Sequence, residues 1–383
     1  MLFYDVTEIS RLDRGTGIQR VIRETYAALQ RLLCDLSIIP VAADILSGDF
    51  FPACYDEGLF RAEPKGEPIR PKKGDIFLSV DLNYKISEGT IAILRGYKKK
   101  GVSIHFVIYD ILPLTKPQYF DFKDSWFDDE DFILQFTRWL KAACELSQSL
   151  ICISAATMRD VSSWITKSED VRRPALKIFR LGTGHIPEPE EASEQVMSIF
   201  NGSPVFVMVG TIEPRKAHAL ALKAFDLLWR QGHRLKLVIV GKCGWASETL
   251  VSSITQHPLF GTSLHFLENL PDNELAQVYR EADALLSLSE AEGFGMPNIE
   301  AAVVGLPIIA RDIPVFREVC GNGAYYLKND ISDAELAQEV LVWLERRGKD
   351  AIPTSDQVEL PTWDQSAKSL LNALELQGPL AHP

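Results

Sequence analysis

The sequence lacks the residue patterns that hold metals tightly, form disulfide frameworks or cross membranes. Its six cysteines are scattered and include no C-x-x-C pair, which favours reduced thiols and a cytoplasmic protein. It contains no H-E-x-x-H and no other close group of histidine, cysteine and carboxylate residues, so we expect no tightly bound metal. No run of about 18 apolar residues is present, so we expect no membrane-spanning helix.

Positive charge is also scarce. The chain has 40 lysines and arginines against 52 aspartates and glutamates, which gives a formal net charge of −12. Proteins that bind nucleic-acid backbones generally present a basic face, so we expect no nucleic-acid partner. Any phosphate group would therefore have to be bound by local arginine, lysine and helix N-termini.

Apolar runs alternate with helical stretches along the 383 residues, and this predicts an α/β protein with doubly wound sheets. We expect strands at 2–6, 37–41, 75–80, 102–109, 150–154, 176–179, 205–209, 235–240, 263–266, 284–288, 307–310 and 324–327. We expect the main helices at 18–33, 86–99, 132–147, 155–166, 218–231, 273–282, 297–304, 315–320, 333–346 and 362–375. A stretch rich in glycine, proline and charge, 182–204, predicts the boundary between two domains, 1–185 and 186–361.

Residues 289–300, with the sequence SEAEGFGMPNIE, are the most informative stretch. They connect a predicted buried strand to a helix that has Pro297 in its first turn. Gly293 and Gly295 allow the backbone to approach a ligand closely, and the free N–H groups of the helix start favour an anion.

Carboxylates surround this loop at Glu290, Glu292 and Glu300. A carboxylate accepts hydrogen bonds from sugar hydroxyls but would repel a phosphate at the same atoms. The loop therefore predicts a ligand with both a polyol end and an anionic end, such as a nucleotide sugar. An ordinary strand, loop and helix with acidic caps is the alternative.

A second motif, at 213–216, reads Glu-Pro-Arg-Lys and lies between a predicted strand and a helix. The forked guanidinium of Arg215 and the compact ammonium of Lys216 could together bind two phosphate groups. The alternative is a solvated charged turn.

Glu292 and Glu300 are separated by seven residues, and this spacing resembles the Glu-x7-Glu signature of retaining glycosyltransferases of the family 4 type. The resemblance extends to residues 209–216 and, more weakly, to the Gly-Thr-Gly loop at 15–20. It implies the GT-B architecture, in which two Rossmann-like domains face each other across a cleft. It also implies that the C-terminal helix and tail, 362–383, return to the N-terminal domain.

The same resemblance implies a metal-independent hexosyltransferase, most like bacterial mannosyl- or rhamnosyltransferases that build O-antigen or exopolysaccharide. We expect a nucleoside-diphosphate sugar as donor, with GDP-mannose ahead of a UDP-sugar, a saccharide or lipid-linked acceptor, and no cofactor. Two alternatives stay open: a sugar-nucleotide epimerase of the same architecture, and a nucleotide-sugar-binding protein without turnover.

The resemblance assigns expected roles to individual residues. Arg215 and Lys216 would stabilise the leaving diphosphate, and Glu300 would hold the ribose hydroxyls. The sugar hydroxyls would be fixed by Glu292 and by the N–H groups of Phe294 and Gly295, while Gly17 would let the N-terminal loop approach the diphosphate.

The sequence departs from the family at one predicted strand end. Many relatives have a histidine immediately before an aspartate there, but this chain has Tyr109 before Asp110, and His105 lies four residues earlier. Asp110 is therefore our candidate for a catalytic residue, because ligands bind at the carboxyl ends of parallel strands. A role as a turn cap is the alternative.

Two further stretches indicate the acceptor side. An aromatic and acidic segment, 119–131, suggests a platform for a saccharide. The alternative, and the more common role of such acids, is to complement the N-terminus of the following helix. The three lysines at 98–100 could contact an anionic membrane surface, although a solvated helix end is the more common explanation of such a stretch. The oligomeric state is not indicated.

Overall fold

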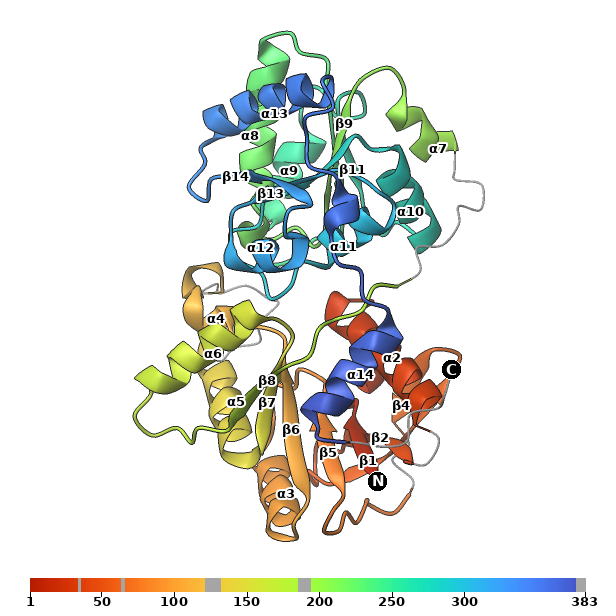
Figure 1. Cartoon of the computed structure of the whole chain (residues 1–383), viewed down its shortest axis with the longest axis vertical. Helices are drawn as coiled ribbons and strands as arrows, with labels where there is room; N and C mark the ends of the chain where they lie inside the picture. Colours follow the sequence, from red (N-terminus) through yellow and green to blue (C-terminus); the bar gives the residue numbers. More distant parts are fainter. Residues whose placement is uncertain (34–35, 63–65, 121–131, 185–193, 377–383) are drawn as a thin grey trace. The chain divides into compact units, whose positions relative to one another are not determined.

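A computed structural model describes residues 1–33, 36–62, 66–120, 132–184 and 194–376 (Figure 1). The chain forms two compact units. Unit 1 contains the described residues of 1–121, 129–182 and 361–383, and unit 2 contains those of 183–360. The predicted boundaries were 185 and 361.

Unit 1 is built on an eight-stranded sheet with the order β4-β3-β2-β1-β5-β6-β7-β8. Neighbouring strands pair in parallel from β2 to β8, whereas β3 is antiparallel to both β2 and β4. The strands are β1 (Leu2–Asp5), β2 (Ile38–Ala43), β3 (Phe50–Asp56), β4 (Leu59–Ala62), β5 (Ile76–Ser79), β6 (Ser103–Ile108), β7 (Ser149–Cys152) and β8 (Ala175–Ile178).

The β3–β4 hairpin is absent from the sequence-based prediction. Its connection has Glu57 and Gly58 at φ +49° and +79°, the two left-handed residues of a tight hairpin turn. Pro52 lies within β3 and lacks a backbone donor, which weakens the strand signal of this segment.

Helices of unit 1 begin at recognisable polar caps. The Thr16 side chain accepts from the Gln19 N–H at the start of α2, and Ser87 and Ser154 cap α3 and α6 in the same way. The helices are α1 (Thr7–Arg11), α2 (Gly17–Leu32), α3 (Glu88–Lys99), α4 (Leu112–Thr115), η1 (Pro117–Tyr119), α5 (Phe132–Leu146), α6 (Ala155–Lys167) and the C-terminal α14 (Trp363–Ala373).

Helix α14 packs on α2 and β8 although it follows unit 2 in sequence. The Asp364 carboxylate pairs with Arg31 at 2.6 Å, and the Ser366 hydroxyl donates to the Arg180 carbonyl at 2.6 Å. A Cβ on Gly182 would lie 2.7 Å from the Trp363 Cα, so the close approach of these two segments requires glycine.

Unit 2 contains a fully parallel six-stranded sheet with the order β11-β10-β9-β12-β13-β14. Its strands are β9 (Val205–Val209), β10 (Lys236–Val240), β11 (Leu264–Leu267), β12 (Ala284–Ser287), β13 (Ile308–Arg311) and β14 (Ala324–Leu327). Its helices are α7 (Glu194–Met197), η2 (Ser198–Phe200), η3 (Pro214–Lys216), α8 (His218–Arg230), α9 (Glu248–Thr255), α10 (Asp272–Glu281), α11 (Met296–Val303), α12 (Pro314–Cys320), α13 (Asp333–Arg347) and η4 (Ser355–Gln357).

The strand order of unit 2 reverses between β9 and β12. From β9 the chain proceeds to β10 and β11 on one side, and then returns to β12, β13 and β14 on the other. The two connections leave β9 and β12 in opposite directions, which opens a crevice at their carboxyl ends. Ligands of open α/β sheets bind at such a switch point.

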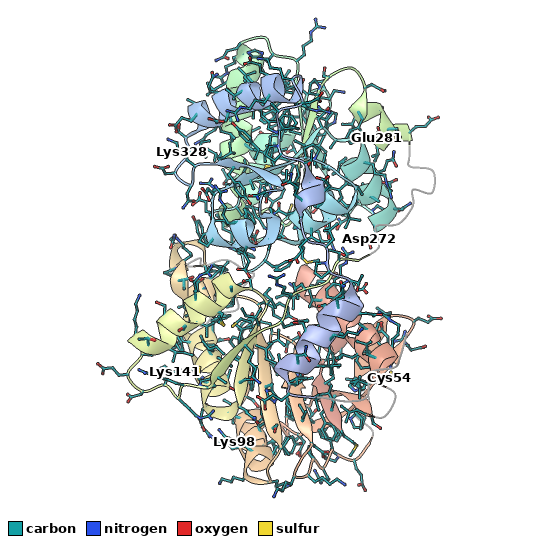
Figure 2. The ribbon with its side chains drawn as sticks, in the orientation of Figure 1. Cys54, Lys98, Lys141, Asp272, Glu281 and Lys328 are labelled. Carbon is teal, nitrogen blue, oxygen red and sulfur yellow. The ribbon has the colours of Figure 1, made fainter. Side chains whose placement is uncertain are left out.

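Each unit has its own apolar core. Lys98, Lys141 and Lys328 are exposed, as Figure 2 shows. No helix in the described part of the chain is both long and apolar enough to span a membrane. Within the same residues, no three histidine, cysteine or carboxylate side chains are grouped so that they could hold a metal ion.

Candidate functional site

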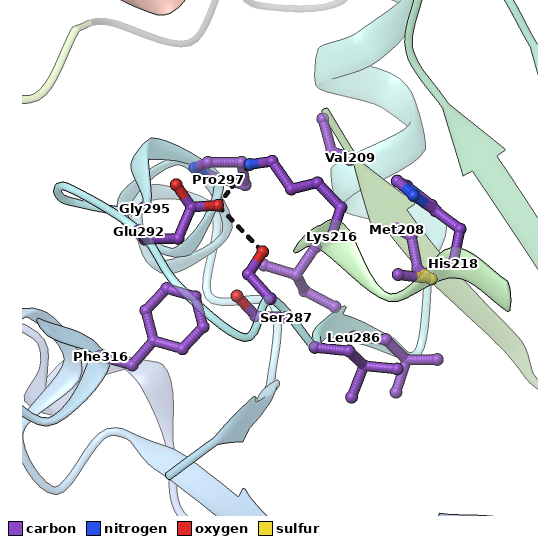
Figure 3. A pocket seen from close by; sticks show the side chains of 13 residues that line it. Met208, Val209, Lys216, His218, Leu286, Ser287, Glu292, Gly295, Pro297 and Phe316 are labelled. Carbon is purple, nitrogen blue, oxygen red and sulfur yellow. Dashed lines mark hydrogen bonds and ion pairs between the residues drawn. The ribbon is translucent and has the colours of Figure 1, made fainter. Parts of the chain in front are cut away.

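A small pocket lies at the switch point of unit 2 (Figure 3). Its walls come from the ends of β9 and β12, from the loops that follow them, and from α12. The lining residues are Met208, Val209, Lys216, His218, Leu285, Leu286, Ser287, Leu288, Ser289, Glu292, Gly295, Pro297 and Phe316. The pocket therefore brings together the two motifs that the sequence singled out.

The loop after β9 is held in place by the loop after β10. The Ile212 N–H donates to the Lys242 carbonyl, and the Gly244 N–H donates to the Ile212 carbonyl, both at 2.9 Å. A Cβ on Gly241 would lie 1.9 Å from the Gly210 carbonyl oxygen, so only glycine permits this contact. The glycine turn at 241–244 thus supports the Glu-Pro-Arg-Lys motif.

Four charged side chains form a network beside the pocket. The Lys216 Nζ donates to the Glu292 Oε1, and the Arg215 Nη1 lies 2.8 Å from the Glu292 Oε2. The Arg215 Nη2 lies 2.5 Å from the Glu213 Oε1, so the guanidinium bridges two carboxylates. These four side chains carry two positive and two negative charges.

Arg215 and Lys216 have different surroundings in this network. Arg215 Nη1 also donates to the Ala291 carbonyl at 2.8 Å, and the Arg215 carbonyl accepts from the Glu290 N–H at 2.8 Å. Arg215 therefore ties the two loops together. The Lys216 ammonium lies over Gly210, where a Cβ would be 3.4 Å from its Nζ, and it faces the pocket.

Glu292 is held as a carboxylate. Burial alone would raise its pKa, but Arg215 and Lys216 outweigh that effect and lower the pKa to about 2. The Ser289 hydroxyl donates to the Glu292 Oε1 at 2.9 Å. An ionised carboxylate can only accept hydrogen bonds, so Glu292 is suited to hold a hydroxyl group and not to donate a proton.

Helix α11 begins at the pocket with a glycine that no other residue could replace. Gly295 has φ +93°, and a Cβ there would lie 2.6 Å from the Phe316 ring. No side chain caps this helix start, and Pro297 occupies the first turn. The predicted N–H donors of Phe294 and Gly295 therefore lie in the loop that enters the helix start, with Gly295 lining the pocket.

Glu300 lies further along α11 and is not among the thirteen lining residues. Its Oε2 accepts a hydrogen bond of 2.7 Å from the Tyr279 hydroxyl on α10. Glu292 and Glu300, the two glutamates of the Glu-x7-Glu motif, thus lie on one segment of loop and helix, but each has its own hydrogen-bond partners.

The candidate residues of the N-terminal half lie in unit 1. Tyr109 is buried, and its hydroxyl donates to the Val80 carbonyl at 2.8 Å, so it supports the sheet. The Asp110 Oδ1 accepts from the Leu112 N–H at 3.0 Å at the start of α4, which is the capping contact considered as the alternative. A catalytic role for Asp110 stays a prediction.

Gly17 is the first residue of α2, directly after the Thr16 cap. A Cβ at this position would meet no atom within 4 Å, so packing does not require glycine here. The Gln19 carboxamide braces the preceding loop, because it accepts from the Arg14 and Thr16 N–H groups. Approach of Gly17 to a diphosphate also stays a prediction.

The acceptor platform falls largely outside the described residues. Only Tyr119 and Phe120 of the segment 119–131 belong to the described part of the chain up to residue 120, where Phe120 is buried. Three polar residues that sequence reasoning did not single out contribute near the site: Ser289, Tyr279 and His218. Of these, only Ser289 lies within a motif, so only it could have been found from local sequence.

Comparison with known proteins gives a family match and two groups of relatives. The sequence model of the family "Glycosyl transferases group 1" matches residues 189–355, which include the whole pocket. Serotype-specific mannosyltransferase WbdA of Escherichia coli is 33% identical over 401 residues, covering 99% of this chain and 46% of WbdA. The O-antigen chain mannosyltransferase RfbU of Salmonella typhimurium is 35% identical over 125 residues, covering 33% of this chain and 34% of RfbU. The chain thus spans about half the length of WbdA.

Solved structures show the same fold at low sequence identity. HepE of Anabaena, in complex with UDP and glucose, superposes with a TM-score of 0.64 at 12% identity, covering 98% of this chain and 99% of HepE. Sucrose-phosphate synthase of Thermosynechococcus elongatus gives 0.61 at 13% identity, covering 98% and 96%. These are GT-B proteins, so the predicted fold class is confirmed.

Proposed function

We propose that this chain is a group 1 glycosyl transferase, since that family's model matches residues 189–355, and that it moves a hexose from a nucleoside-diphosphate sugar to a saccharide or lipid-linked acceptor. The transfer would proceed with retention of configuration and without a metal ion. Its product would be part of a surface polysaccharide.

One observation carries this proposal: Lys216 and Glu292 meet at the switch-point pocket, next to the uncapped start of α11. A donor has an anionic diphosphate and a neutral polyol. The pocket offers a cation and a helix N-terminus for the first part and an ionised carboxylate for the second. Few other ligands would need both within one pocket.

The chemistry we infer is electrostatic. As the bond between sugar and diphosphate breaks, negative charge grows on the leaving phosphate, and Lys216 would stabilise it. Arg215 would add positive charge and keep the loop of Glu292 in place. Glu292 would accept hydrogen bonds from sugar hydroxyls, and Glu300 would hold the ribose. The departing phosphate would take the proton of the attacking acceptor hydroxyl, so no protein nucleophile is required.

Mannose is our first choice of sugar, with GDP-mannose ahead of a UDP-sugar as donor. Support comes from WbdA, a mannosyltransferase whose similarity extends over nearly the whole chain. HepE, which was solved with UDP and glucose, shares only the fold at 12% identity, so it carries little weight for the base or the sugar.

We place the enzyme in the cytoplasm, in peripheral contact with the membrane where a lipid-linked acceptor would be presented. Lys99 and Lys100 are exposed at the end of α3 and could face anionic lipid, whereas the Lys98 Nζ is occupied by the Glu145 carbonyl.

The test is a panel of sugar nucleotides incubated with the protein and a lipid-linked or oligosaccharide acceptor. The proposal expects acceptor-dependent release of one nucleoside diphosphate and a lengthened saccharide. An epimerase would convert the sugar nucleotide without an acceptor, and a binding protein would release nothing. Either result would overturn the proposal.

A further inference from the structure

His218 is a buried side chain whose ring has an unmet hydrogen-bonding capacity. It is the first residue of α8 and lines the pocket, yet only 2% of its surface is exposed. Its Nδ1 has no hydrogen-bond partner among the residues that the structure describes. A buried polar atom without a partner costs roughly 1–3 kcal/mol, so its presence calls for an explanation.

A second buried histidine shows that burial alone does not leave an imidazole nitrogen without a partner. His105, on β6 in unit 1, is also 2% exposed, but its Nδ1 lies 2.7 Å from the Ser149 hydroxyl. The chain therefore satisfies one buried imidazole internally and leaves the other facing a pocket.

The surroundings of His218 suit an anion. Lys216 lines the same pocket (Figure 3), and Ala217, the N-cap residue of the thirteen-residue helix α8, provides no side-chain cap. The positive end of the helix dipole thus points towards the pocket side of His218. Burial, and then the charge of Lys216, lower the pKa of His218 to about 3, so the free imidazole is neutral and still carries one N–H.

We propose that His218 is a further donor-binding residue and that its imidazole hydrogen-bonds to a phosphate oxygen of the nucleoside diphosphate. This inference rests on the proposed function, because it names another contact in the same donor site. The ligand would supply the partner that the protein does not, and the N–H groups of the first turn of α8 would face the same phosphate.

The sharpest test follows the histidine ring signals by NMR in the intact, 15N-histidine-labelled chain. The His218→Leu variant identifies the His218 signal by its loss, and His105→Gln identifies the control. Titration with GDP or UDP should shift the His218 signal and leave that of His105 unchanged. Guanosine and uridine, which lack phosphate, should not shift it. A shift with the nucleosides alone would overturn the phosphate contact.

The His218→Leu variant gives an independent measurement. Replacing an unpartnered imidazole by an apolar side chain should leave the melting temperature unchanged or raise it. Calorimetry should show GDP or UDP bound about tenfold more weakly or worse than by the unmodified chain. The proposal thus expects weaker nucleotide binding without a lower melting temperature. Loss of a purely structural histidine would instead lower the melting temperature.

Different results would contradict the role of His218 and the proposed function. If the unmodified chain binds a nucleoside diphosphate, but the His218 signal stays in place and His218→Leu binds equally well, the inference is wrong and the proposed function stands. If calorimetry detects no binding of GDP or UDP, the proposed function fails and the inference fails with it.

Discussion

The ammonium of Lys216 is paired with the carboxylate of Glu292, 76 residues later in the chain, at the point where the sheet of unit 2 reverses its strand order. This pair joins the two sequence motifs into one site. In the proposed donor complex a diphosphate would share Lys216 with Glu292, whereas Glu300 has other partners. We therefore expect Glu292 and Glu300 to respond differently to substitution.

Glu292→Gln should retain or strengthen affinity for the nucleoside diphosphate while lowering turnover. The substitution removes a negative charge beside the phosphate site but also an acceptor for sugar hydroxyls. Glu300→Gln should weaken the nucleoside diphosphate itself, since Glu300 is assigned to the ribose. Calorimetry with GDP or UDP decides between them, and a loss of affinity in Glu292→Gln alone would reverse the two roles.

Tyr279→Phe should weaken binding of the nucleoside diphosphate several-fold. It removes the hydroxyl that donates to the Glu300 Oε2 and so leaves that carboxylate less firmly oriented. Tyr325→Phe is a matched control, because the Tyr325 hydroxyl donates to Glu339 outside the pocket. Equal effects of the two substitutions on affinity would show that Tyr279 acts only through stability.

Asp110→Asn should cut transfer severely while the fold stays intact, because an asparagine oxygen can still accept from the Leu112 N–H. Tyr109→Phe should lose stability, on the order of 1 kcal/mol, and little activity, because the hydroxyl bonds only within the sheet. Melting curves and transfer rates of both variants test this. A normally active Asp110→Asn enzyme would leave Asp110 with the capping role alone.

Asp5→Asn should stabilise the protein at pH 8 by up to about 3 kcal/mol, and less at pH 5. Burial raises the pKa of Asp5 to about 6, against the hydrogen bonds from Thr7 and Ser79. A raised native pKa means that stability is present below pH 3.8 and is lost as the pH rises through about 6. Asparagine can keep accepting from Thr7 and can donate to the Ser79 hydroxyl. Melting temperatures at the two pH values check the prediction, and a destabilised variant at pH 8 would contradict it.

Much of the fold was predictable because parallel strands are short apolar runs followed by polar turns. The β3–β4 hairpin was missed because its strands are partly exposed and Pro52 interrupts the pattern. Within the site, the charged and glycine residues were found from local spacing. The Tyr279–Glu300 hydrogen bond and the tie from Arg215 to the Ala291 carbonyl were not, since both depend on packing between separate elements. The orientation of Tyr109 into the sheet depends on the strand's place among its neighbours, which the sequence does not display.

Arg215→Lys tests the proposed difference between the two cations. It keeps the charge but cannot reach Glu213, Glu292 and the Ala291 carbonyl at once. We expect a lower melting temperature together with reduced turnover. Unchanged stability with a large loss of donor affinity would instead show that Arg215 mainly binds phosphate.

The most direct test of the account measures acceptor-dependent release of the nucleoside diphosphate by Lys216→Ala, beside Lys223→Ala as a control. Lys223 is exposed on the following helix, α8, and does not line the pocket, so that variant removes an equal charge elsewhere. Lys216→Ala should lower kcat on the order of a hundredfold or more, with a smaller loss of donor affinity, because charge on the diphosphate grows towards the transition state. Lys223→Ala should be normal. The central claim is that this cation stabilises the leaving group. A Lys216→Ala enzyme with unchanged kcat would contradict it, even if the affinity for the donor were reduced.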